Sequence, residues 1–68
     1  MSKLTKGALE VVTTREVPLG VSDTLIPCGE AGYVIGGALL PAWIVLFPRL
    51  GVHGAVPKDA LRPTGRRG

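Results

Sequence analysis

The chain has very few of the residues that most often build catalytic and metal sites. It contains one cysteine (Cys28), one histidine (His53) and five acidic residues in 68. A lone cysteine excludes a disulfide within the chain, and one cysteine with one histidine gives too few ligands for the usual zinc sites. The acidic residues form no spaced pair suited to acid–base catalysis, and the glycine patterns of nucleotide-binding loops are absent. We therefore expect a protein that is not an enzyme, with no catalytic residue, metal or cofactor, and we interpret His53 as a surface residue.

Long apolar segments free of helix breakers are also missing. Ten glycines and six prolines take 16 of the 68 positions, which disfavours a helical bundle because both residues interrupt helices. Hydrophobic residues still make up 46% of the chain, too many for intrinsic disorder. A chain of this length forms one domain with a small core. The chain does not open with the basic and apolar regions of a secretory signal, so we expect a cytoplasmic location.

The longest stretch without a charge covers residues 31–48, a length of 18. This reaches the lower limit for crossing a bilayer as a helix, so a single-span membrane protein is one alternative. Gly36, Gly37 and Pro41 interrupt the stretch, and the segments on either side are rich in β-branched and aromatic residues. The preferred interpretation is two strands joined by a turn, and we do not expect a membrane partner.

Short apolar runs separated by glycine and proline predict an all-β fold. Strands are expected at 8–14, 33–35, 42–47 and 53–56, with a brief closing strand at 62–63. Residues 15–30 are expected to form a long loop containing at most a short strand, and residues 36–41 a hairpin connection. Proline followed by residues that tolerate a helix predicts one 3₁₀ turn at 57–61. About five short strands with one such turn are typical of a small β-barrel.

Two segments resemble those of Src-homology-3-like (SH3-like) barrels. In that family a strand with a tryptophan precedes the pattern Gly-x-x-Gly-x-aliphatic-Pro, a 3₁₀ turn and a last short strand. Here Trp43 is followed by residues 51–63, GVHGAVPKDALRP. Residues 29–34, GEAGYV, are similar to the Gly-x-x-Gly-x-Val turn of the wider superfamily. The resemblance covers residues 29–63 and implies a small SH3-like barrel.

The resemblance implies no particular activity, because this fold carries many unrelated functions. Members that bind proline-rich peptides begin with an Ala-Leu-Tyr-Asp-Tyr strand. Here Ala8-Leu9 is followed by Glu10-Val11-Val12, so the tyrosines of the proline-binding groove are missing. Type II dihydrofolate reductases carry Val-Gln-Ile-Tyr where this chain has residues 53–56, HGAV, so their catalytic pore is not implied either.

The strand expected at 42–47 is apolar on both faces when its residues are taken alternately. One face belongs to the core, and the other is either covered by the loop at 15–30 or open to a partner. We predict a small non-catalytic adapter module that binds a protein partner or a second copy of itself. The candidate binding residues are Tyr33, Trp43, Phe47 and Pro57.

Charge is distributed unevenly along the chain. Residues 1–30 carry three basic and four acidic side chains, a net charge of −1, whereas residues 31–68 carry five basic and one acidic, a net charge of +4. The alternative function is therefore a nucleic-acid-binding barrel, because clustered basic side chains bind phosphates. Its candidate residues are Arg49, Lys58, Arg62, Arg66 and Arg67. No apolar residue follows Pro63, so we expect the barrel to span residues 1–63 and residues 64–68 to form a basic flexible tail.

Overall fold

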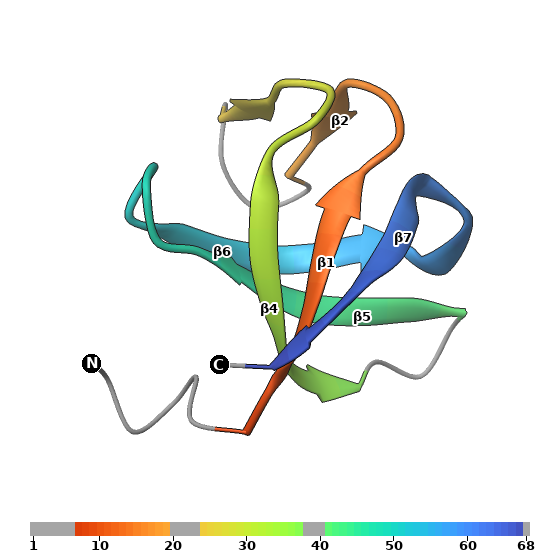
Figure 1. Cartoon of the computed structure of the whole chain (residues 1–68). Helices are drawn as coiled ribbons and strands as arrows, with labels where there is room; N and C mark the ends of the chain where they lie inside the picture. Colours follow the sequence, from red (N-terminus) through yellow and green to blue (C-terminus); the bar gives the residue numbers. More distant parts are fainter. Residues whose placement is uncertain (1–6, 20–23, 38–40, 68) are drawn as a thin grey trace.

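A computed structural model describes residues 7–19, 24–37 and 41–67 of the chain (Figure 1). Within these residues the backbone forms seven strands and one 3₁₀ helix. The elements in chain order are β1 (Leu9–Thr13), β2 (Val17–Pro18), β3 (Leu25–Ile26), β4 (Ala31–Gly37), β5 (Ala42–Phe47), β6 (Val52–Pro57), η1 (Lys58–Ala60) and β7 (Leu61–Arg67). The all-β prediction and the single 3₁₀ turn are confirmed for this part of the chain.

Five of the strands form one antiparallel sheet in the order β6-β5-β4-β1-β7, while β2 and β3 pair as a separate hairpin. The sheet is strongly curved, so that β1, β4 and β7 run crosswise to β5 and β6 (Figure 1). Among the described residues the sheet is not closed into a barrel, because its edge strands β6 and β7 pair only with β5 and β1. The short helix η1 links these two edges along the chain without hydrogen-bonding them to each other.

Most predicted elements lie within two residues of the observed ones. β5 has the expected bounds, and the long loop at 15–30 contains the hairpin of β2 and β3. Residues 38–40 of the expected hairpin connection lie outside the described residues.

The largest difference is β7, which continues to Arg67 and pairs with Leu9 there. The expected tail at 64–67 is therefore extended strand, and Gly65 with a φ of 89° lies where the register with β1 shifts. The prediction of a flexible tail at these four positions is corrected by this pairing.

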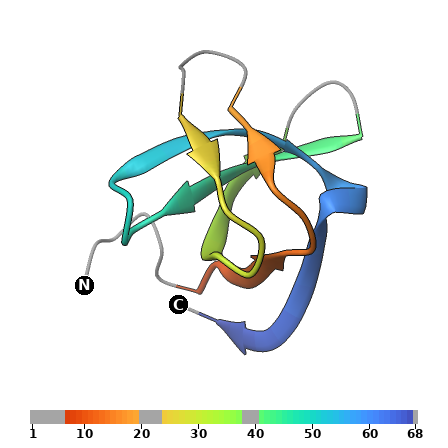
Figure 2. The same ribbon diagram turned by 90° about the horizontal axis from the view of Figure 1, so that it is seen from above.

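The core lies between one face of the curved sheet and the β2–β3 hairpin, which sits at one end of the sheet (Figures 1 and 2). From Ile44 to Phe47 the side chains of β5 alternate between half-buried and buried, and Val45 and Phe47 are 0% exposed. Leu19, just after β2, lies against Gly54 of β6 on the same inner side. The hairpin thus covers the inner face of the sheet. The buried apolar residues are Val11, Val17, Leu19, Ile26, Val45, Phe47, Val56, Ala60 and Leu61.

Candidate functional site

The strand register defines an outer face of the sheet, on the side away from the core. Residues directly opposite one another in neighbouring strands point to the same side. Glu10 is opposite Tyr33, Tyr33 is opposite Leu46, and Leu46 is opposite His53. These four residues form a row across β1, β4, β5 and β6, with Glu10 at one end and His53 at the other.

Apolar side chains occupy the centre of this face. Tyr33 and Leu46 are half-buried in the middle of the row. Ile44, two residues before Leu46 on the same strand, is half-buried opposite the exposed Ala55 of β6. Val12 of β1 is half-buried on the same face, because it lies two residues after Glu10. We call these five residues, Val12, Tyr33, Ile44, Leu46 and Ala55, the outer apolar strip.

The structure separates the four candidate binding residues. Phe47 is 0% exposed and packs in the core, so the prediction that it contacts a partner is wrong. Trp43 lies on the same inner side of β5 and packs half-buried against the core. Tyr33 and Pro57 lie on the outer face, Pro57 exposed at the end of β6 opposite Ala42. Two of the four candidates, Trp43 and Phe47, therefore lie on the inner side of the sheet, and the other two lie on the outer face.

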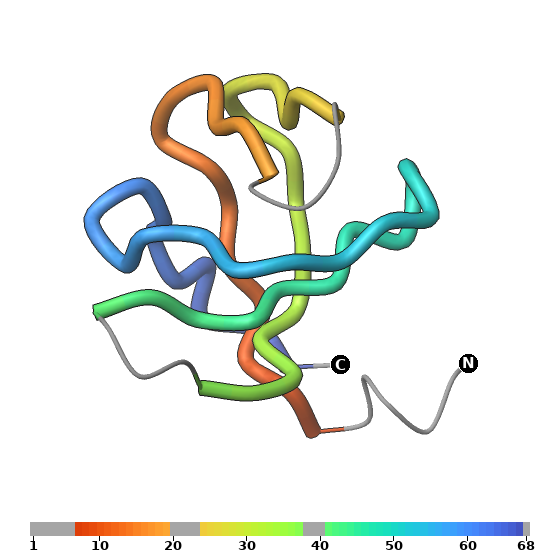
Figure 3. Tube along the Cα trace, turned by 180° about the vertical axis from the view of Figure 1, so that it is seen from behind, coloured from red at the N-terminus to blue at the C-terminus, as the bar shows by residue number. Residues whose placement is uncertain are grey.

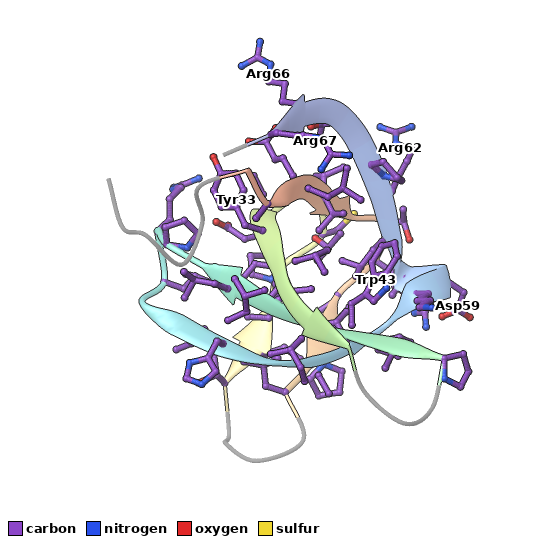
Figure 4. All side chains as sticks on the ribbon, turned by 90° about the horizontal axis from the view of Figure 1, so that it is seen from below. Tyr33, Trp43, Asp59, Arg62, Arg66 and Arg67 are labelled. Atoms are coloured by element: carbon purple, nitrogen blue, oxygen red, sulfur yellow. The ribbon has the colours of Figure 1, made fainter. Side chains whose placement is uncertain are left out.

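Trp43 takes part in a contact with η1 rather than with the outer apolar strip. The Lys58 Nζ atom lies 5.3 Å from the centre of the Trp43 ring, and Figure 4 shows the tryptophan beside η1. Arg15 forms an exposed ion pair with Asp59 at 3.4 Å. Exposed ion pairs contribute at most about 1 kcal/mol, so we attribute the position of η1 mainly to the burial of Ala60.

Four of the five basic candidates gather on η1 and β7. Lys58 lies in η1, and Figure 4 shows Arg62, Arg66 and Arg67 along β7. All four are exposed, and the Arg67 Nη1 atom donates to the carbonyl oxygen of Gly7 at 3.2 Å. Arg49 belongs to the turn between β5 and β6, at the opposite end of these strands from η1 (Figures 1 and 3). The structure therefore groups Lys58 with the three arginines and leaves Arg49 apart.

Glu10 separates the arginines of β7 from Tyr33. The Thr64 hydroxyl donates to Glu10 Oε1 at 2.6 Å, and Glu10 is directly opposite Tyr33 on the next strand. A nucleic acid that followed the arginines toward the tyrosine ring would pass this carboxylate. The basic strand and Tyr33 therefore do not form the continuous cationic, aromatic groove on which single-stranded bases stack.

Neither a cluster of metal-binding side chains nor a pocket is found among the described residues. No helix in this part of the chain is both long and apolar enough to cross a membrane. Comparison with protein-family models, curated proteins and solved structures finds no match to this chain.

The residues of this outer face that the sequence does not single out as binding residues are Glu10, Val12, Ile44, Leu46 and Ala55. Alternation along 42–47 places Ile44 and Leu46 together on one face, without showing which face is buried. Glu10 reaches Tyr33 through the pairing of β1 with β4, which connects positions 23 residues apart. Only the observed register gives this information.

Proposed function

We propose that this chain is a small non-catalytic binding module that contacts another protein through the outer apolar strip. One observation supports the proposal: Ile44 and Leu46 remain half-exposed, although Val45 and Phe47 on the other side of the same strand complete the core. Apolar side chains gathered on an outer face are typical of protein interaction sites. Tyr33 lies at the centre of the strip. Tyrosine is one of the residue types enriched at the few interface positions that contribute most of the binding free energy.

We also infer that the domain is an SH3-like one. The order of elements supports this inference, since Trp43 lies near the start of β5, Pro57 ends β6, η1 follows at once and β7 comes last. The inference concerns the fold, and the binding proposal rests on the outer apolar strip alone. A cytoplasmic location remains a prediction from the sequence.

Photo-crosslinking from position 33 tests the binding proposal. Tyr33 is replaced by p-benzoylphenylalanine, which keeps an aromatic ring at the centre of the strip. Irradiation in a lysate of the source cells is expected to join this variant to another polypeptide chain, and Leu46→Lys is expected to abolish the product because it places a charge in the strip.

The matched control carries the same photoreactive residue at Leu50, which is 40% exposed in the turn between β5 and β6 and lies off the strip. Equal yields from positions 33 and 50 would contradict the proposal, as would a complete lack of product from position 33 in the folded variant.

A second candidate function is sequence-independent binding of nucleic acid along β7. It is favoured by the three exposed arginines that this strand presents, Arg62, Arg66 and Arg67. If each contacts one phosphate of a single strand, the logarithm of the binding constant is expected to fall against the logarithm of salt concentration with a slope of about −2. Fluorescence anisotropy with a labelled oligonucleotide measures this slope.

The triple variant Arg62→Glu, Arg66→Glu and Arg67→Glu is expected to abolish that binding, whereas Arg49→Glu is expected to leave it nearly unchanged. Absence of binding at about 50 mM salt, or an equal loss in Arg49→Glu, would argue against this second function.

A further inference from the structure

Strand β7 brings a basic side chain to the edge of the outer apolar strip. Arg62 is directly opposite Val12, a member of the strip, so the two side chains point to the same side of the sheet. Thr64, two residues further along β7, also lies on this side, and its hydroxyl donates to the Glu10 carboxylate. The outer face therefore continues from β1 onto β7.

Arg66 and Arg67 lie on different sides of β7. Arg67 is opposite Leu9, which packs against the core, so Arg67 belongs to the inner side. Its Nη1 atom donates to the Gly7 carbonyl oxygen. Arg66 precedes it in the strand and so points to the outer side, and Figure 4 shows Arg62 and Arg66 projecting away from the ribbon. The outer side of β7 thus carries two arginines, and the third faces the other way.

Neither of these two outer arginines forms an ion pair among the described residues. The ion pair found there joins Arg15 to Asp59. The acid closest to the outer arginines in the strand register is Glu10, whose Oε1 atom accepts from the Thr64 hydroxyl at 2.6 Å. Both outer arginines are exposed, and a guanidinium group binds a carboxylate through two parallel hydrogen bonds. The outer side of β7 is therefore suited to carboxylates supplied by another molecule.

We propose that the outer apolar strip binds a short acidic segment of another protein. The carboxylates of the segment pair with Arg62 and Arg66, and an apolar side chain next to them packs on Val12 and Tyr33. This proposal rests on the proposed function. Opposing residues of neighbouring strands have their Cβ atoms about 5 Å apart, so acidic and apolar groups that are close together in one peptide reach both Arg62 and Val12.

Glu10 favours an acidic protein segment over a nucleic acid. Its carboxylate lies between the β7 arginines and Tyr33, because Glu10 is opposite Tyr33 on one side and bonded to Thr64 on the other. A nucleic acid carries a phosphate at every nucleotide and would bring one of them close to this carboxylate. A protein segment instead has room for a neutral residue at that point.

The shape of the sheet favours a narrow partner over a broad one. Strands β1, β4 and β7 run crosswise to β5 and β6, so the outer face is convex and a flat surface touches only part of it (Figure 1). A peptide segment needs only β7, β1 and β4, which span about 10 Å at the usual strand spacing. A second copy of the same face would bring arginine against arginine, and like charges oppose association.

The free edge of β7 is poorly suited to the alternative in which the segment adds as a further strand. Pro63 has no N–H to donate, and Gly65 has a φ of 89° where the register with β1 shifts. Proline, charged side chains and irregularities in an edge strand hinder the addition of another strand. The segment therefore docks on the face of the sheet through its side chains.

Titration with a designed peptide tests the proposal. The probe is a fluorescein-labelled peptide of about ten residues with glutamates in one half and leucines in the other, long enough at about 3.3 Å per residue to cross the three strands. Fluorescence anisotropy measures its dissociation constant, and amide chemical shifts are expected to change in β7, β1 and β4. A peptide with lysine for each glutamate, and another with serine for each leucine, are each expected to bind about tenfold more weakly or worse.

Three variants of the protein locate the charged contact. Arg62→Glu and Arg66→Glu are each expected to weaken binding of the acidic peptide about tenfold or more, because each replaces a charge-assisted pair by repulsion. Arg67→Glu is the matched control, since it makes the same change of charge on the inner side of the same strand. It is expected to change the dissociation constant by less than about threefold, because salt screens the more distant charge. Far-ultraviolet circular dichroism confirms that each variant is folded.

The outcomes separate this proposal from the two candidate functions. An equal loss in Arg67→Glu overturns the specific pairing, because it shows that only net charge matters. Undiminished binding of the serine peptide overturns the joint contact with the outer apolar strip. Failure of the acidic peptide to bind overturns the acidic segment, while crosslinks from position 33 to another protein would still support the proposed function. A labelled oligonucleotide that binds more tightly than the acidic peptide overturns it in favour of nucleic-acid binding along β7.

Discussion

Gly32→Ala is expected to destabilise the domain by about 3 kcal/mol, the upper part of the range for overpacked cores. A Cβ atom at Gly32 would lie 2.7 Å from Val45 Cγ1, 2.9 Å from the carbonyl oxygen of Leu46 and 2.9 Å from Phe47 Cδ1. Val45 and Phe47 are both 0% exposed, so neither side chain has free space to move into. The Leu46 oxygen belongs to the backbone of β5, which pairs with β4 at this point. Relief of the clash therefore requires β4 and β5 to separate.

Gly37→Ala is the matched control, because Gly37 lies in the same strand and a Cβ atom there would meet nothing within 4 Å. Its free energy of unfolding is expected to stay within about 0.5 kcal/mol of the wild type, as for ordinary surface substitutions. Urea denaturation followed by tryptophan fluorescence measures both variants, since Trp43 packs against the core. Equal stabilities for the two variants would show that Gly32 is not needed for close packing.

Gly32 also explains why the sequence does not show which face of β5 is buried. Both alternate sets of side chains in residues 42–47 are apolar, so the pattern alone fits either choice. The missing side chain at Gly32 makes room for Val45 and Phe47, and this fixes the inner face. Which face of β5 is buried is therefore decided by a contact between β4 and β5. The sequence of β5 alone holds no information about that contact. The sequence pattern therefore allows Phe47 at a surface, although it belongs to the core.

Strand β7 is longer than its sequence indicates, for a different reason. Residues 61–67, LRPTGRR, contain one apolar side chain, a proline and a glycine, so they lack the alternation that indicates a strand. The segment is extended because it pairs with β1, more than 45 residues earlier in the chain. In contrast, the bounds of β5 follow from the sequence, because a compact run of β-branched and aromatic residues ends at Pro48.

The row from Glu10 to His53 could not be predicted, because its members come from four strands and share no motif. Each is unremarkable at its own position: an acid within a strand, a tyrosine after a glycine turn, a leucine in an apolar run and a lone histidine. Pairing in register brings them onto one face. The candidate binding surface is therefore a property of the sheet, and Tyr33 is the one member of the outer apolar strip that the sequence identifies as a binding residue.

The position of Tyr33 depends in turn on a buried threonine at the end of β1. Thr13 is 2% exposed, and its hydroxyl donates to the Pro27 carbonyl oxygen at 2.7 Å while accepting from the Glu30 backbone N–H at 2.9 Å. Two backbone bonds reinforce the contact: the Thr13 N–H donates to the Glu30 oxygen, and the Gly29 N–H donates to the Thr13 oxygen. Thr13 therefore holds the turn at 27–30, from which β4 begins.

Thr13→Val is expected to destabilise the domain by about 3 kcal/mol. Valine keeps the shape of threonine but leaves the buried Glu30 N–H without its acceptor, at a cost of about 1–3 kcal/mol, and also removes the donor to the part-buried Pro27 carbonyl. Thr13→Ser keeps the hydroxyl and removes one methyl group, a loss of about 1 kcal/mol. Urea denaturation is therefore expected to rank serine above valine, the reverse of the order that side-chain hydrophobicity would give.

Hydrogen exchange at the Glu30 amide distinguishes this explanation from a general loss of packing. In Thr13→Val that amide loses its acceptor, so it is expected to exchange faster than amides in β5 and β6, whereas in Thr13→Ser it stays protected. A valine variant as stable as the serine variant, with a protected Glu30 amide, would show that the hydroxyl does not hold the turn. Because Tyr33 lies three residues after Glu30, loosening this turn is also expected to weaken any binding through the outer apolar strip, even though Thr13 lies on the opposite face of the sheet.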